Sequence, residues 1–98
     1  MAMKKNYSKE MRDHGISRTL RQRLRQGEFR GGSDVKALRR FVRMSQSEFA
    51  HALGISIRTL QNWEQDVRMP EGPALALLSI AAAHPRIIRA RAREQSAA

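Results

Sequence analysis

The feature that most constrains the fold is a short helix with both of its ends specified, between Ser45 and Gly54. Ser45 and Glu48 form a capping-box pattern, in which the serine hydroxyl accepts from the backbone N–H of Glu48 and the carboxylate reaches back to the backbone N–H of Ser45. Apolar side chains follow at helical spacing up to Leu53. Gly54 then suits the left-handed position after a helix, which other residues adopt at a cost. The pattern therefore predicts a helix that begins after Ser45 and ends at Leu53.

A second short helix is predicted directly after a turn at residues 54–56. Ile55 is expected to be buried in this turn, and the next residue is a serine suited to cap a helix over Ile57–Gln65. Leu60 and Trp63 lie at i, i+3 in that helix and are expected to face the core. Two amphipathic helices joined in this way form a helix-turn-helix pattern. By itself this pattern is weakly specific, because helical bundles use similar turns.

The rest of the chain is also predicted to be helical. Periodicity and capping residues predict helices over Ser17–Gln26, Val35–Arg43, Pro73–Ala83 and Arg86–Gln95. Ser33 or Asp34 is expected to cap the helix at 35–43, and Gly31-Gly32 is interpreted as a flexible break between two parts of the chain. Residues 1–32 are thus predicted to form a basic, partly flexible arm with one short helix. Residues 33–95 are predicted to form an all-α domain of about five helices.

The charge of the chain favours a polyanionic partner. Nineteen Lys and Arg residues against nine Asp and Glu residues give a net charge of +10. Residues 1–33 hold nine of these basic residues and three of the acidic ones. Such a surplus favours binding to a phosphate backbone, although it can also serve solubility. The arginines of residues 18–30 have three interpretations: an arm on DNA phosphates, a segment that binds a protein partner, or a solubilising tail.

Several other classes of protein do not fit the sequence. There are no cysteines, which excludes disulfides and thiolate zinc sites. His14, His51 and His84 are scattered, so we predict no metal site and no cofactor. No nucleophile–base pattern, phosphate-binding loop or dinucleotide fingerprint is present, and we do not expect an enzyme. Pro73–Ala83 is too short to span a bilayer, and Met1–Lys5 leads into no secretory signal. We therefore expect a cytoplasmic protein.

Residues 44–65 resemble the Xre/Cro-repressor helix-turn-helix family. The matching residues are Ser45, Gln46, Phe49, Ala50, Leu53, Gly54, Ser56, Thr59, Leu60, Trp63 and Glu64, followed by Arg68 and Pro70. The resemblance extends over about residues 34–83. It implies a lambda-repressor-like fold and a repressor that binds double-stranded DNA. A homodimer on a palindromic operator would place two recognition helices about 34 Å apart. We expect the contact between the two copies at the C-terminal helix, through Ile87 and Ile88.

The segment after the second short helix points to one group within this family. Residues 68–78, followed by His84-Pro85, resemble the HigA-type antitoxins, whose partner is an mRNA-cleaving toxin of the RelE type. The resemblance therefore implies the antitoxin and autoregulator of a toxin-antitoxin operon. RelE-type toxins are themselves basic, and the basic segment at 1–33 fits poorly with wrapping around one. A stand-alone, phage or plasmid regulator of the same family is the alternative.

The resemblance also implies which residues act. The implied DNA-binding site consists of Gln46, Ser56, Ile57, Arg58, Gln61 and Asn62. Arg58 can form two hydrogen bonds to guanine, while Gln61 and Asn62 can do so to adenine. The alternative is that these residues form only a solvated helix face. Arg39 and Glu64 resemble a pair that bridges the first and third helices of family repressors, and the alternative is two separate surface charges.

Overall fold

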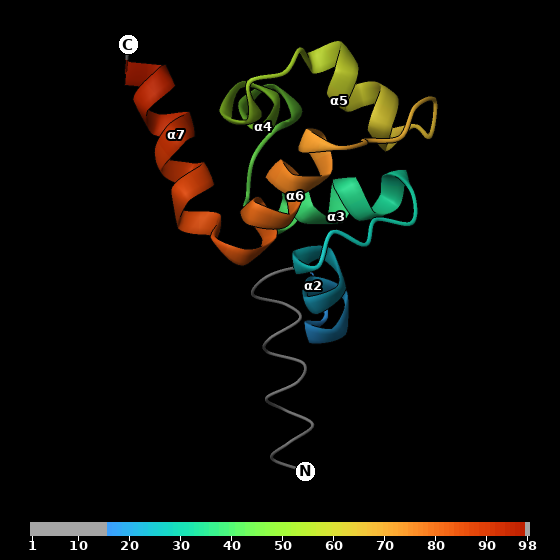
Figure 1. The fold of residues 1–98 in the computed structure, drawn as a ribbon. Coiled ribbons are helices and arrows are strands. Elements are labelled where there is room, and N and C mark those ends of the chain that lie inside the picture. The colour runs from blue at the N-terminus through green and yellow to red at the C-terminus, as the bar shows by residue number, and fades with distance from the viewer. Residues whose placement is uncertain (1–15, 98) are drawn as a thin grey trace, which may run out of the picture.

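The protein is all-α, as the sequence predicts, in the part that the structure describes. The computed structural model describes residues 16–97, whose regular structure consists of six helices (Figure 1). These are α2 (Arg18–Arg25), α3 (Gly32–Phe41), α4 (Gln46–Leu53), α5 (Ile57–Glu64), α6 (Pro73–Ala83) and α7 (Pro85–Ala97). The break predicted between the last two helices lies at His84, and α7 begins directly after it at Pro85.

Serine caps begin three of the helices. The hydroxyl of Ser45 accepts from the backbone N–H of Glu48 at 3.1 Å, and the Glu48 carboxylate accepts from the backbone N–H of Ser45 at 2.9 Å. Ser56 caps α5 in the same way through the backbone N–H of Thr59, and Ser17 caps α2. Gly54 has a φ of 76° and ends α4 in the left-handed conformation. The predicted bounds of the first short helix are therefore confirmed, and the second begins at Ile57 as predicted but ends at Glu64, one residue early.

The hydrophobic core lies between α3 and the helices around it. Its largest fully buried side chains are Leu24, Val35, Leu38, Phe41, Val42, Phe49, Leu60 and Leu78. Leu60 and Trp63 point inward from α5, as predicted, and Ile55 is half-buried against the same core. Because α5 is anchored by this one apolar side, its other side remains available to a partner.

Helix α2 belongs to this core and is not part of a separate arm. Its Leu24 is fully buried, and the helix packs mainly against α6. The Nε of Arg21 donates to the carbonyl of Ala82 at 3.2 Å, and its guanidinium lies over the Phe41 ring, 4.8 Å from the centroid. The boundary predicted at Gly31-Gly32 is therefore not where the core ends. Residues 1–15 of the predicted arm lie outside the described residues.

The Gly31-Gly32 pair is a point of close packing rather than a flexible break. Helix α3 begins at Gly32, with Gly31 and not Ser33 or Asp34 as its N-cap. A Cβ atom on Gly32 would lie 2.4 Å from the carbonyl oxygen of Glu64, at the end of α5. The backbone N–H of Gly32 donates to Oδ1 of Asp66 at 2.7 Å. The first turn of α3 is thus capped from the loop that follows α5.

Asp34, predicted as a helix cap, instead joins α2 to α3. Its carboxylate lies 2.8 Å from Nη1 of Arg23 and accepts from the backbone N–H of Arg30 at 2.9 Å. Burial alone would raise the pKa of Asp34, but the hydrogen bond from Arg23 and the backbone of Arg30 outweigh it and leave this pKa below its ordinary value. The carboxylate therefore stays charged and holds the α2–α3 junction.

Candidate nucleic-acid interface

The outer face of α5 carries the residues for which a DNA contact is predicted. Ser56, Ile57 and Arg58 are exposed at the start of the helix, and the side chain of Ile57 is 44% exposed. Gln61 and Asn62 are half-buried and follow Arg58 at i+3 and i+4, the spacing of one helical face. The structure thus gathers these residues on the side of α5 that lies opposite its anchored side.

Gln46, at the start of α4, is tied to this face. Nε2 of Gln61 donates to Oε1 of Gln46 at 3.3 Å, and Nε2 of Gln46 donates to Oε1 of Glu64 at 3.1 Å. Each of the two glutamines keeps one amide N–H for another acceptor, and Gln61 also keeps its carbonyl oxygen. The two side chains are therefore held in place with donor and acceptor groups to spare.

Glu64 anchors this arrangement from inside the protein. Its carboxylate receives two hydrogen bonds from Arg39, with Nε at 2.7 Å from Oε2 and Nη2 at 3.2 Å from Oε1. The Arg39 guanidinium also donates to the carbonyl of Met44 at 3.1 Å. The Glu64 side chain is only 1% exposed and that of Arg39 15%. The two residues thus form a largely buried ion pair that links α3, the turn before α4 and α5.

The charge of Glu64 is maintained by its partners. Burial would raise the pKa of the carboxyl, but the hydrogen bonds from Arg39 and Gln46 and the positive charge of Arg39 lower it by more. The pKa of Glu64 is therefore below its ordinary value of 4.5. Near neutral pH the carboxylate is ionised and accepts from both donors.

The arginines of α2 lie far from this face. In Figure 1, α2 and α5 stand at opposite sides of the described part of the protein. Arg21 and Arg23 are also engaged in contacts within the fold, with Ala82 and Asp34. Of the three interpretations of residues 18–30, the arm on phosphates is thus not supported for these two arginines, which hold the fold together.

Two contributors to this region were not predicted from the sequence. The bond from Gln46 to Glu64 and the cap that Asp66 provides to Gly32 are not implied by the sequence. Asp66 has a φ of 63°, in the left-handed region that Asp tolerates better than most residues. Asp66 follows directly on the predicted helix Ile57–Gln65 and could have been recognised as a residue that ends a helix. Its partner Gly32 is distant in the sequence, so the contact between the two residues could not be predicted from local spacing.

Other kinds of site find no support in residues 16–97. This part of the chain contains no group of three or more His, Asp or Glu residues that could hold a metal ion. None of its helices combines the length and the apolar character needed to cross a membrane.

Comparisons with known proteins also indicate a helix-turn-helix. A family model described as helix-turn-helix matches residues 35–81. Antitoxin HigA-2 of Vibrio cholerae serotype O1 is 38% identical over 55 residues, which is 56% of this chain and 53% of that protein. The chain thus spans about half the length of this relative. No solved structure gives a significant match. Residues 35–81 therefore match the helix-turn-helix family, and over about half of its length the chain is similar to antitoxin HigA-2.

Proposed function

We propose that this protein is a sequence-specific transcriptional repressor that reads its operator with α5, and that it is the antitoxin and autoregulator of a HigBA-type operon. The observation that carries the first part is the polar outer face of α5, with Arg58 exposed and Gln61 and Asn62 half-buried, on a helix anchored by Leu60 and Trp63. A helix held on one side and polar on the other is the element that enters a major groove.

Each part of the face has a role in this proposal. The guanidinium of Arg58 reads the O6 and N7 atoms of a guanine, and Gln61 and Asn62 pair with adenine edges. Ser56 and Gln46 contact the phosphates beside the groove, and Ile57 packs against the edges of the bases. Because Gln46 and Gln61 are bonded to each other, the DNA-facing amides are oriented before DNA arrives.

A homodimer on a palindromic operator is part of the proposal. Ile88 is only 4% exposed and packs in the core, so the contact predicted through Ile88 does not fit. Ile87 on the same helix is 54% exposed, and Leu77 and Ile80 on α6 are 40% and 45% exposed. These apolar side chains are the candidates for the contact, because burial against a second copy would remove them from water.

The antitoxin role rests on the likeness to HigA-2. That likeness covers about half of each chain, and residues 35–81 are the part that matches the DNA-binding family. A stand-alone regulator without a toxin is the second candidate. It is favoured by the basic character of residues 1–33, because a strongly cationic segment is poorly suited to wrap a basic toxin. The two candidates share the operator-binding function and differ in the protein partner.

Base preference is expected to depend on Arg58. Replacing it by alanine removes the contact to one base, which costs about 1–3 kcal/mol for the preferred DNA and little for random DNA. Site selection from a random duplex pool should therefore show a palindrome with the wild type and lose the preference at one position in each half-site with Arg58→Ala.

Arg25→Ala is the matched control, because Arg25 is exposed on α2, away from α5. This variant should select the wild-type sequence. Unchanged base preference in Arg58→Ala, in a protein with normal circular dichroism, would mean that α5 does not read the operator through this residue.

The toxin partner is tested by co-expression. If the gene next to this one encodes a small RelE-like protein, producing both proteins should relieve growth arrest and yield a stable complex on purification. Arg58→Ala should retain this protection while losing the base preference at one position in each half-site, because it alters only the DNA-facing side of α5. Persistent toxicity without co-purification would leave the stand-alone regulator as the function.

A further inference from the structure

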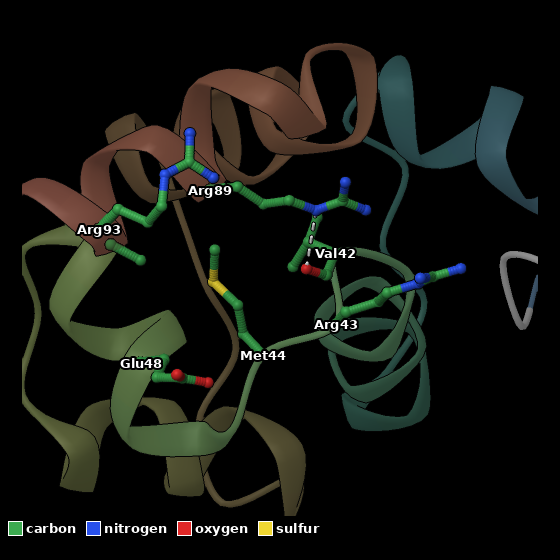
Figure 2. A pocket seen from close by; sticks show the side chains of 7 residues that line it. Val42, Arg43, Met44, Glu48, Arg89 and Arg93 are labelled. Atoms are coloured by element: carbon green, nitrogen blue, oxygen red, sulfur yellow. Dashed lines mark hydrogen bonds between the residues drawn. The ribbon is translucent and has the colours of Figure 1, made fainter.

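A basic pocket opens where the turn between α3 and α4 meets α7. Figure 2 shows Arg89 and Arg93 reaching over Met44 from α7, with Arg43 on the turn and Glu48 on α4. The lining residues are Val42, Arg43, Met44, Glu48, Arg89, Ala92 and Arg93. The guanidinium groups of Arg89 and Arg93 lie over an apolar floor that includes Met44, while Arg43 extends outward from the turn (Figure 2). Glu48 is the single carboxylate in the lining.

Two of the charged groups in the pocket are held by contacts within the fold. The Nε of Arg89 donates to the carbonyl of Val42 at 3.2 Å, which fixes α7 to the turn. The carboxylate of Glu48 is already engaged, because it accepts from the backbone N–H of Ser45 in the capping box. Arg43 and Arg93 are exposed. The lining of the pocket thus holds three arginines against one carboxylate, an excess of positive charge.

The pocket adjoins the candidate DNA interface. Met44 in its floor and Gln46 at the start of α4 are separated only by Ser45, and Gln46 is bonded to Gln61 on the reading face. The pocket therefore lies beside the start of α4, which is part of the candidate interface. Helix α2, by comparison, stands on the opposite side of the described residues from α5 (Figure 1).

We infer that Arg43, Arg89 and Arg93 form a second phosphate-binding surface, which holds the DNA backbone on the flank of the site that α5 reads. This inference rests on the DNA-binding function proposed above and extends it to α7. Phosphate contacts of this kind fix the position of a protein on DNA and add affinity that is independent of sequence. Each neutralised phosphate contributes about −0.9 to the slope of log K against log salt concentration.

The test compares two arginine-to-glutamine variants with equal net charge, Arg93→Gln in the pocket and Arg25→Gln on α2. Dissociation constants are measured between about 50 and 200 mM salt for the duplex selected by the wild type and for a random duplex. Arg93→Gln should weaken binding to both duplexes alike and reduce the slope of log K against log salt by about 0.9. Raising the salt across this range should therefore weaken its binding about 3.5-fold less than it weakens that of the wild type. Arg25→Gln should keep the wild-type slope. Arg93→Glu should weaken both duplexes further.

The inference is overturned if Arg93→Gln keeps the wild-type slope, or if Arg25→Gln lowers it equally, since the effect would then follow from net charge alone. Weaker binding of a polyglutamate peptide by Arg93→Gln at an unchanged DNA slope would assign the pocket to an acidic protein segment and also overturn it. The proposed repressor function is tested separately, by whether the wild type selects a sequence at all. Whether or not the wild type selects a sequence, the salt slope for random DNA shows whether the pocket arginines bind phosphate.

Discussion

Gly32→Ala should destabilise the protein by about 3 kcal/mol or more, at the upper end of what overpacking costs. The added Cβ would lie 2.4 Å from the carbonyl oxygen of Glu64 and 2.5 Å from that of Trp63. Both neighbours are backbone atoms at the end of α5, so no side chain can rotate out of the way. Relief requires α3 and α5 to move apart, which would also strain the bond from Gly32 to Asp66. The midpoint of thermal unfolding should fall by roughly 12–24 °C.

The neighbouring glycine provides the control. Gly31 has a φ of 175°, an extended conformation open to any residue, and a Cβ there would meet Asp66 Oδ1 at 3.4 Å, an ordinary contact. Gly31→Ala should therefore unfold near the wild-type temperature or slightly above it, since alanine restricts the unfolded chain. Circular dichroism melts of the two variants make the comparison. Equal midpoints would show that α5 does not press on the start of α3.

Glu64→Gln should cost about 3 kcal/mol of folding free energy, because it leaves the largely buried guanidinium of Arg39 without its counter-charge. The loss should be far larger than at an exposed pair. Glu28→Gln is the matched control: the Glu28 and Arg30 side chains are 56% and 71% exposed, and such pairs contribute about 0–1 kcal/mol. Urea unfolding of the three proteins measures the difference. A wild-type midpoint in Glu64→Gln would mean that the pair adds nothing to stability.

The same pair predicts how stability responds to acid. The folded pKa of Glu64 is lower than its ordinary value of 4.5, so the unfolded chain takes up protons first as the pH falls. The contribution of Glu64 is therefore complete above pH 4.5 and is lost as the pH drops through the lowered folded value. The pKa of Asp34 is likewise lowered from its ordinary value of 3.8, so its contribution to stability is lost in the same way at lower pH. In Glu64→Gln, the free energy of unfolding should no longer show the decrease due to Glu64 as the pH falls, and should keep the decrease due to Asp34.

What the sequence predicted correctly depends on local chemistry. The capping box at Ser45 and Glu48, the left-handed Gly54 and the inward side of α5 each involve residues within one or two turns of each other. Local spacing is enough to predict such features, because their partners are fixed by the geometry of one helix. The likeness to known repressors added the bridge between Arg39 and Glu64, which spacing alone does not imply.

What the sequence did not predict depends on contacts between distant residues. Gly32 looks like a flexible break until the carbonyls of α5 are placed against it. Asp34 has the right residue type for a helix cap, and only the fold brings Arg23 to it. Ile87 and Ile88 are alike in sequence, yet Ile88 is in the core and Ile87 is exposed, because packing against the neighbouring helices decides which side of α7 faces inward.

The hydrogen bonds that join α2 and α3 to residues much later in the chain have a consequence for synthesis on the ribosome. The cap on Gly32 comes from a residue 34 positions later, and the bond from Arg21 reaches a residue 61 positions later. At about 5–20 residues per second, several seconds separate the appearance of Arg21 from that of its partner. Within the described part of the chain, the helix made first thus docks only after α6 has emerged. Until then the apolar side of α2, with Leu24, has no core to enter and is open to chaperones or to other chains.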